Sequence, residues 1–187
     1  MVTIGLDLST TKVGIFGLDD NGKKLFWDYV NLTSSKIEKD LISRVDAFFL
    51  ELTRILVCAN LRPQDVEWAI EAPLFINPYA GKSNPNTIAK LIAFNWMITY
   101  TIHKLFDVCP IHQNVNSARK TVFGSFPKGT DKKQKVMDLV IEMFPEIADI
   151  PKKYRDDVTD AYVMARTRYE LRQNSSSENG IGGTQKK

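Results

Sequence analysis

Asp7 is a carboxylate inside a segment that otherwise has the pattern of a buried β-strand. Ile4, Leu6 and Leu8 alternate with smaller or charged residues, namely Gly5 and Asp7. A strand would therefore send the apolar residues into a core and Asp7 to the opposite face. Strands disfavour aspartate, and an unpaired acid beside a core costs free energy. The pattern favours a functional role for Asp7.

The segments that follow predict two more strands. A polar turn at 9–11 leads into a second alternating run at 13–17. A further turn at 19–22 leads into a third strand at 24–32. The three strands are expected to form an antiparallel meander.

Helical periodicity comes after the meander. Ser35 and Glu38 have the spacing of a capping box, and apolar residues recur at helical intervals as far as about Asn60. The other predicted elements are a strand at 66–71, a loop at 74–86, a helix at 87–105, a strand at 108–113 and helices at 131–143 and 156–172.

This order of elements predicts an α/β fold. We expect a mixed five-stranded sheet, a three-strand antiparallel meander plus two parallel strands, flanked by helices on both faces. The chain of 187 residues is long enough for one substantial core, which we place in a domain over 1–172. Residues 173–187 have the composition of a disordered polar tail.

Composition narrows the class of protein only slightly. The net charge of +3 permits an anionic partner without requiring one. Cys58 and Cys109 lack metal-ligand spacing, so we expect reduced core residues of a cytoplasmic protein. No signal peptide is expected, because Met1 leads directly into a strand. Polar residues interrupt the apolar run 88–105, which predicts a buried helix and not a membrane span.

A second acid is expected beside Asp7. In the strand at 66–71, Glu71 shares one face with Glu67 and Ala69, opposite the apolar residues. If this strand pairs with the first strand, Asp7 and Glu71 lie side by side at one edge of the sheet.

The last helix contributes two more acids. Asp157 and Asp160 are three positions apart and therefore project from one helical face. Ala161 and Ala165 lie near that face and would let the helix approach the sheet closely.

Carboxylates gathered at one place repel one another unless a cation lies among them. Mg²⁺ and Mn²⁺ suit such oxygen ligands, and two ions about 3.5–4 Å apart are the usual device for in-line attack on a phosphodiester. Each acid also has a purely structural explanation. Asp157 could cap a helix, Asp160 could pair at the surface with Arg155 or Lys153, and Glu71 could be a charge at a strand end.

Four segments carry a more specific signal: GLDLSTTKVGIFGLD, AIEAPLF, SARKTVFGSFPKGTDKKQKVMDLV and DDVTDAYVMA. Together they resemble the RuvC-type Holliday junction resolvases of the retroviral integrase and RNase H-like superfamily, over about residues 3–170. The resemblance implies a homodimeric, metal-dependent endonuclease that cuts symmetric strands of a four-way DNA junction. It also implies two Mg²⁺ ions per site, with Mn²⁺ as a substitute, and no nucleotide cofactor or membrane partner. The residues that match the family's acids by position are Asp7, Glu71, Asp157 and Asp160.

The sequence departs from the bacterial pattern at two places. Ala72 and Pro73 follow the second acid, where bacterial members usually carry a polar residue. Asp156 precedes Asp157, so Asp156 and Asp160 form a rival pair at i, i+4 spacing, although the family register favours Asp157. The departures and the polar tail favour a phage or viral version of the enzyme.

The loop at 74–86 carries candidate DNA contacts. Phe75, Tyr79 and Lys82 form a mixture that is typical of proteins that stack on bases and touch phosphate. The resemblance implies a role for Phe75 at the junction centre. Packing of Phe75 or Tyr79 under the loop is the alternative.

Positive charge gathers before and within the penultimate helix. Such a run would supply phosphate contacts, although a solvated helix face has the same pattern. Lys133 aligns to within one residue with a family lysine at the catalytic cleft, where it would neutralise charge on the scissile phosphate. The basic residues are Arg119, Lys120, Lys128, Lys132, Lys133 and Lys135.

Several alternatives stay open. The helix at 87–105 is apolar around much of its circumference, which fits either a dimer interface or a central core helix. A YqgF-like relative acting on RNA would use the same acids, and a catalytically idle junction-binding protein would keep the fold. The opening segment also resembles the first phosphate motif of actin-like ATPases and sugar kinases. Those proteins need a second lobe and a glycine-rich adenosine segment, and this chain is about half their usual length.

Overall fold

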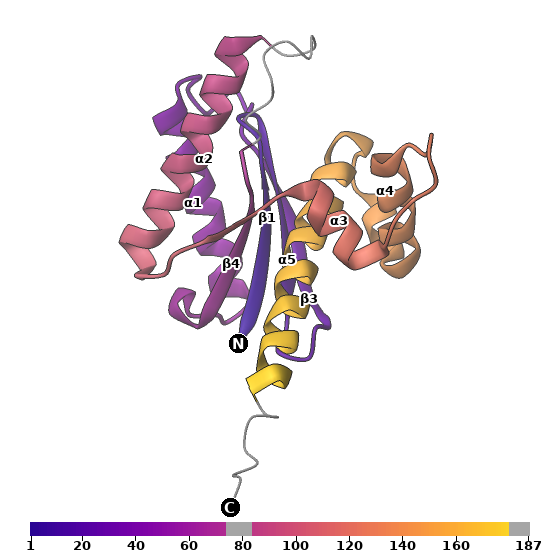
Figure 1. The fold of residues 1–187 in the computed structure, drawn as a ribbon. Helices are drawn as coiled ribbons and strands as arrows, with labels where there is room; N and C mark the ends of the chain where they lie inside the picture. Colours follow the sequence, from indigo (N-terminus) through magenta and orange to yellow (C-terminus); the bar gives the residue numbers. More distant parts are fainter. Residues whose placement is uncertain (74–83, 180–187) are drawn as a thin grey trace, which may run out of the picture.

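A five-stranded sheet with helices on both faces forms the centre of the molecule (Figure 1). The structure is a computed structural model, and it describes residues 1–73 and 84–179. The strands lie in the order β3-β2-β1-β4-β5. Their bounds are β1 Val2–Leu8, β2 Lys12–Leu18, β3 Lys24–Asn31, β4 Val66–Glu71 and β5 Ile111–Gln113.

The strand directions confirm the predicted mixed sheet. β1, β2 and β3 pair antiparallel as a meander, whereas β4 pairs parallel with both β1 and β5. Leu6 of β1 lies opposite Ile70 of β4. The next residues along these two strands are Asp7 and Glu71, so the register brings the two acids to adjoining positions at one end of the sheet.

Two helices cover one face of the sheet and three lie on the other (Figure 1). The first pair is α1 (Leu41–Cys58) and α2 (Pro85–Phe106). The second group is α3 (Val115–Phe123), α4 (Lys132–Met143) and α5 (Lys152–Asn179). Short 3₁₀ turns at Pro63–Asp65 and Pro145–Asp149 precede β4 and α5.

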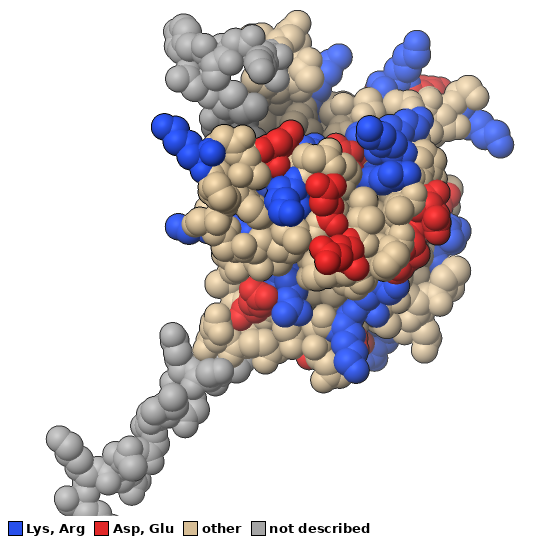
Figure 2. Space-filling view, turned by 90° about the vertical axis from the view of Figure 1, so that its right-hand side faces the viewer, with Lys and Arg blue, Asp and Glu red and all other residues tan. Residues whose placement is uncertain are grey.

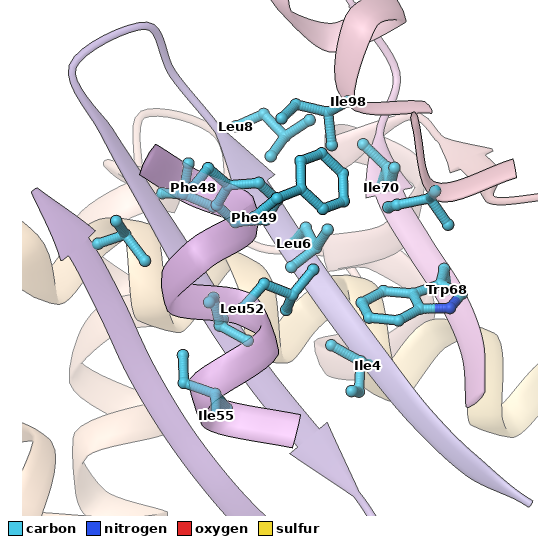
Figure 3. Close-up of a cluster of buried hydrophobic side chains, with 14 of the residues drawn as sticks. Ile4, Leu6, Leu8, Phe48, Phe49, Leu52, Ile55, Trp68, Ile70 and Ile98 are labelled. Carbon is cyan, nitrogen blue, oxygen red and sulfur yellow. The ribbon is translucent and has the colours of Figure 1, made fainter. Parts of the chain in front are cut away.

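The alternating residues of β1 and β4 build the core beneath α1 and α2. Ile4, Leu6 and Trp68 are fully buried there against Phe48 and Leu52 of α1 (Figure 3). Burial of side chains of this size contributes roughly 1.5–3 kcal/mol each. The apolar face of both strands is therefore used for packing, which leaves the acid-bearing face to α5.

Helix α5 lies unusually close to the sheet because glycine occupies the contact points. A Cβ atom at Gly5 would overlap the main-chain carbonyl of Ala161, and one at Gly14 would overlap that of Asp157. Ala161 and Ala165 are small and fully buried on the facing side of α5, as their sequence positions predicted. The missing side chains let the helix backbone rest on β1 and β2.

The start of the first helix was predicted wrongly, and one helix was missed. Helix α1 begins at Leu41, and Asp40 caps it by accepting a hydrogen bond from the Ser43 amide, so the Ser35 capping box is not used. Helix α3 was not predicted. It starts after Asn114, whose side chain accepts hydrogen bonds from the amides of Asn116 and Ser117.

The end of α5 and the cysteines also differ from expectation. Helix α5 continues through residues 173–179, beyond the expected boundary at 172. The division of the chain into a domain and a tail stays a prediction. Cys58 and Cys109 are exposed and not in the core, because they lie at the end of α1 and in the loop before β5.

Helix α2 is only partly covered, so the interpretation as a central core helix was wrong. Phe94, Ile98 and Ile102 are fully buried, but Trp96 and Tyr100 are 52% and 63% exposed.

Among the helices of the described residues, none combines the length and hydropathy needed to cross a bilayer.

Replacement of Gly14 by alanine should separate α5 from the sheet. We expect Gly14→Ala to lower the free energy of unfolding by roughly 1–3 kcal/mol, because the new methyl group meets main-chain atoms that cannot rotate away. Gly17→Ala is the matched control, because its Cβ would meet only the ring of Phe26, which can move. Urea denaturation of both variants measures the difference. An equal loss in the two variants would contradict the close-contact argument.

Candidate active site

Asp7 and Glu71 form the sheet half of a carboxylate cluster. Their carboxyl groups lie within hydrogen-bonding reach of one another, and each affects the pKa of the other. Burial raises the pKa of Asp7 well above its ordinary value, and the charges of Glu71, Asp160 and Asp157 raise it further. Burial also raises the pKa of Glu71, although the hydrogen bond from Asp7 opposes that effect. Both acids therefore hold a proton to higher pH than free carboxyl groups do.

Helix α5 supplies the other half of the cluster. Asp157 and Asp160 are only 6% and 5% exposed, and both act electrostatically on Asp7. Burial raises the pKa of Asp157 to about 6, even though Lys12 opposes the shift. The structure thus brings together all of the acids predicted from the sequence, one from β1, one from β4 and two from α5.

The two helix acids are each paired with a basic side chain. Arg119 of α3 donates to both carboxylate oxygens of Asp160, with Nη2 at 2.7 Å from each. The Nζ atom of Lys12 lies 2.6 Å from Oδ2 of Asp157. Arg119 was predicted as a DNA contact, and here it lies inside the acidic cluster.

Two of the structural explanations offered for these acids do not hold, whereas Glu71 does lie at the end of a strand. Helix α5 begins at Lys152, so Asp157 is not its N-cap. Asp160 pairs with Arg119, while Arg155 donates to main-chain carbonyls before the helix.

Asp156 faces a different set of groups from Asp157. Its Oδ2 lies 2.7 Å from Nζ of Lys133 and its Oδ1 lies 3.4 Å from Nζ of Lys12. Burial raises the pKa of Asp156, but the ion pair with Lys133 outweighs it and the net pKa is lowered. The acid that acts on Asp7 is Asp157, which favours Asp157 over Asp156 as the partner of Asp160.

Lys133 reaches the edge of the cluster from the first turn of α4. Burial lowers its pKa, but the ion pair with Asp156 and the charges of Asp160 and Asp7 reverse this and raise it.

Lys12 was not predicted as a site residue. Its position directly after the turn that follows Asp7 was the available signal, because a hairpin returns the chain to the same end of the sheet.

Two basic clefts flank the start of α4. One, of about 390 Å³, lies toward α3 and includes Lys120 and Lys132 in its lining, and the other, of about 440 Å³, lies toward α5 and includes Lys133 and Lys152. Figure 2 shows Lys and Arg side chains gathered over the upper part of one face of the molecule, with acidic side chains between and below them.

The remaining predicted DNA contacts are placed as follows. Lys128 and Lys135 are exposed, in the loop before α4 and on α4. Phe75, Tyr79 and Lys82 lie outside the described residues.

The chemistry of the acids suits a divalent metal ion, but two of the acids, Asp157 and Asp160, are ion-paired with basic side chains. Within residues 1–73 and 84–179, no three His, Cys, Asp or Glu side chains are grouped so that they could hold a metal ion as they stand. Carboxylate oxygens that mutually raise a pKa are nevertheless the donors that Mg²⁺ prefers. The carboxylate oxygens of Asp157 and Asp160 that would hold such an ion are paired here with Lys12 and Arg119.

A five-stranded mixed sheet of this order, with acids on its central strands and on the helix packed across them, defines the RNase H-like class of fold. Within that class the chain has a RuvC-type fold. It is similar to Thermus thermophilus RuvC in complex with a Holliday junction substrate, with a TM-score of 0.64 and 16% identity, over 94% of this chain and 97% of that one. A second Thermus thermophilus RuvC structure gives a TM-score of 0.59 and 17% identity, over 93% and 97%. No family profile and no curated protein matches the sequence.

The raised pKa values predict how stability depends on pH without metal. An acid whose pKa is higher in the folded state stabilises the protein below its unfolded pKa, and this contribution is lost as pH rises through the folded value. For Asp157 the loss falls between about pH 4 and 6, and Asp7 adds a loss at higher pH. In EDTA, we therefore expect wild type to lose stability from pH 5 to pH 8.

Asp7→Asn should reduce this loss, because it removes one ionisable group from the cluster. Asp138→Asn, on the exposed side of α4, should leave the loss unchanged. Urea midpoints at the two pH values measure the difference. A wild-type midpoint that rises from pH 5 to pH 8 would contradict the sign.

Proposed function

We propose that the chain is a structure-selective DNA endonuclease that resolves four-way junctions by metal-dependent phosphodiester hydrolysis. The observation that carries the proposal is the convergence of Asp7, Glu71, Asp157 and Asp160 from three elements of a RuvC-type fold. The similar Thermus protein was solved with a Holliday junction substrate, which supports branched DNA as the substrate.

The four acids would hold two Mg²⁺ ions, or Mn²⁺ as a substitute. When bound, these ions supply an activated water and stabilise the leaving oxygen. Asp7 and Glu71 would hold the ions from the sheet. Asp157 and Asp160 would hold them from α5, in place of their present ion pairs with Lys12 and Arg119. Hydrolysis then leaves a 5′ phosphate and a 3′ hydroxyl.

The basic side chains take up phosphate charge. Lys133 lies at the edge of the cluster and would face the scissile phosphate. Arg119, once released from Asp160, would contact the same or an adjacent phosphate, and Lys120, Lys128 and Lys132 would bind the strand along the cleft between α3 and α4. Phe75, Tyr79 and Lys82, in the segment of the sequence after β4, are proposed to contact the junction.

A homodimer would supply the two sites that symmetric cutting requires. The exposed apolar side chains of α2, Trp96, Tyr100 and Leu105, are proposed to meet a second copy of the chain. Burial of large aromatic residues would be the main gain from this contact.

One observation favours a second candidate, a catalytically idle junction-binding protein. The ion pairs of Lys12 with Asp157 and Arg119 with Asp160 already neutralise half of the acidic cluster. Stable pairs of this kind would keep the fold and the basic clefts but prevent metal binding. A relative of the YqgF type acting on RNA would keep the acids and change the substrate.

Cleavage of a labelled, branch-mobile four-way junction with Mg²⁺ tests the proposal directly. Linear duplex, single strand and an RNA–DNA hybrid of the same sequence serve as controls. We expect paired, symmetric nicks confined to the junction. Preferred cutting of the hybrid would move the function to RNA, and tight binding without cutting would favour the idle protein.

Asp7→Asn should abolish cleavage and leave junction binding largely intact. It removes a proposed metal ligand without removing a phosphate contact, and Asp138→Asn is the matched control. Cleavage assays and gel shifts on the same preparations measure the two properties. Equal losses of binding and cutting would contradict this division of roles.

Lys132→Ala should weaken junction binding through the salt-dependent part of the affinity. Loss of one phosphate contact should reduce the slope of log K against log salt by about 0.9. Lys90→Ala, an exposed lysine on α2 across the sheet, should leave the slope unchanged. Fluorescence anisotropy over a salt series gives both slopes, and equal slopes in wild type and Lys132→Ala would exclude Lys132 from the interface.

A further inference from the structure

Asn95 is a polar side chain inside the apolar core between α2 and the sheet. It is only 2% exposed, and its helix neighbours Phe94 and Ile98 are fully buried. A buried amide costs free energy unless its donors and acceptor are satisfied. The contacts that Asn95 makes therefore indicate why an amide is present there.

The amide of Asn95 holds the end of the strand that carries Glu71. Its Nδ2 donates to the main-chain carbonyl of Glu71 at 2.9 Å. The next amide, that of Ala72, donates to the carbonyl of Gln113 on β5 at 2.8 Å. These two bonds hold opposite sides of the Glu71–Ala72 peptide. They limit rotation at the residue whose carboxyl group faces Asp7.

His112 and Thr99 fix the orientation of the Asn95 amide. Nε2 of His112 lies 3.0 Å from Oδ1 of Asn95 and 3.1 Å from Oγ1 of Thr99. The hydroxyl of Thr99 donates to the carbonyl of Asn95 at 2.9 Å, so its only hydrogen is already used. Nε2 of His112 must then carry the proton and donate to Asn95. This bond keeps the Oδ1 atom toward His112 and the Nδ2 atom toward Glu71.

We propose that Asn95 is a positioning residue that holds Glu71 in the orientation needed to bind metal. This inference rests on the proposed function of the acidic cluster. Groups that orient a metal ligand typically contribute 10–100-fold to metal affinity or activity. Asn95 contacts the main-chain carbonyl of Glu71 but no carboxyl oxygen of the acids, and it does not line the basic clefts. Its loss therefore affects metal binding and leaves junction binding unchanged.

Two variants of Asn95 and one control test the proposal. Asn95→Ala removes the hydrogen bond to Glu71. Asn95→Asp keeps the size of the side chain and the acceptor toward His112, but it replaces the donor by an oxygen, and it serves where the alanine variant fails to fold. Ile98→Ala is the control, because it destabilises the same buried stretch of α2 without touching Glu71. Urea midpoints identify variants of comparable stability.

The first readout is Mn²⁺ binding by isothermal titration calorimetry in the absence of DNA. We expect the Asn95 variants to bind Mn²⁺ roughly 10–100-fold more weakly than wild type. Ile98→Ala should stay close to wild type. The second readout is single-turnover cleavage, whose rate at limiting Mn²⁺ should fall with the lost affinity while the gel-shift Kd for the junction is unchanged.

The outcomes separate this inference from the proposed function. Wild-type Mn²⁺ affinity in the Asn95 variants, or an equal loss in Ile98→Ala, overturns the positioning role. If wild type binds Mn²⁺ but cuts none of the DNA substrates, the proposed function fails and the calorimetric comparison still decides the role of Asn95. Absence of Mn²⁺ binding by wild type would overturn both.

Discussion

The distance between α5 and the sheet is the constraint on which the rest of the structure depends. It is set by side chains that are missing at Gly5 and Gly14, where the helix backbone rests directly on the strands. This contact places Asp157 and Asp160 close enough to Asp7 to raise its pKa. Because protein interiors are close-packed, a single added methyl group at the contact would move both helix acids away from the sheet together.

The clustered acids lower the stability of the folded protein. Burial and the charges of neighbouring acids raise the pKa of Asp7 and Glu71, which shows that their ionised forms are unfavourable in the folded protein. Apolar packing on the other face of the same strands offsets this loss of stability, since Ile4, Leu6 and Trp68 are fully buried there. The sheet thus separates the residues that stabilise the fold from those that carry the proposed chemistry.

Much of the sheet and the carboxylate cluster could be predicted, because they follow from strand alternation, helical spacing and small residues. The alternation in β1 and β4 predicted the faces of Asp7 and Glu71 correctly. Helix α3 was missed because it has only 9 residues, and polar residues separate its few apolar positions. Lys12 and the pairing of Arg119 with Asp160 were missed for another reason. They depend on how separate elements pack together, which local spacing does not encode.

The ion pairs around the acids change the electrostatic field that the site produces at long range. Lys12, Arg119 and Lys133 place positive charge among the carboxylates. The long-range field of the cluster is therefore weaker than that of a bare group of acids. An approaching polyanion meets less electrostatic repulsion at this end of the sheet than the acids alone would exert.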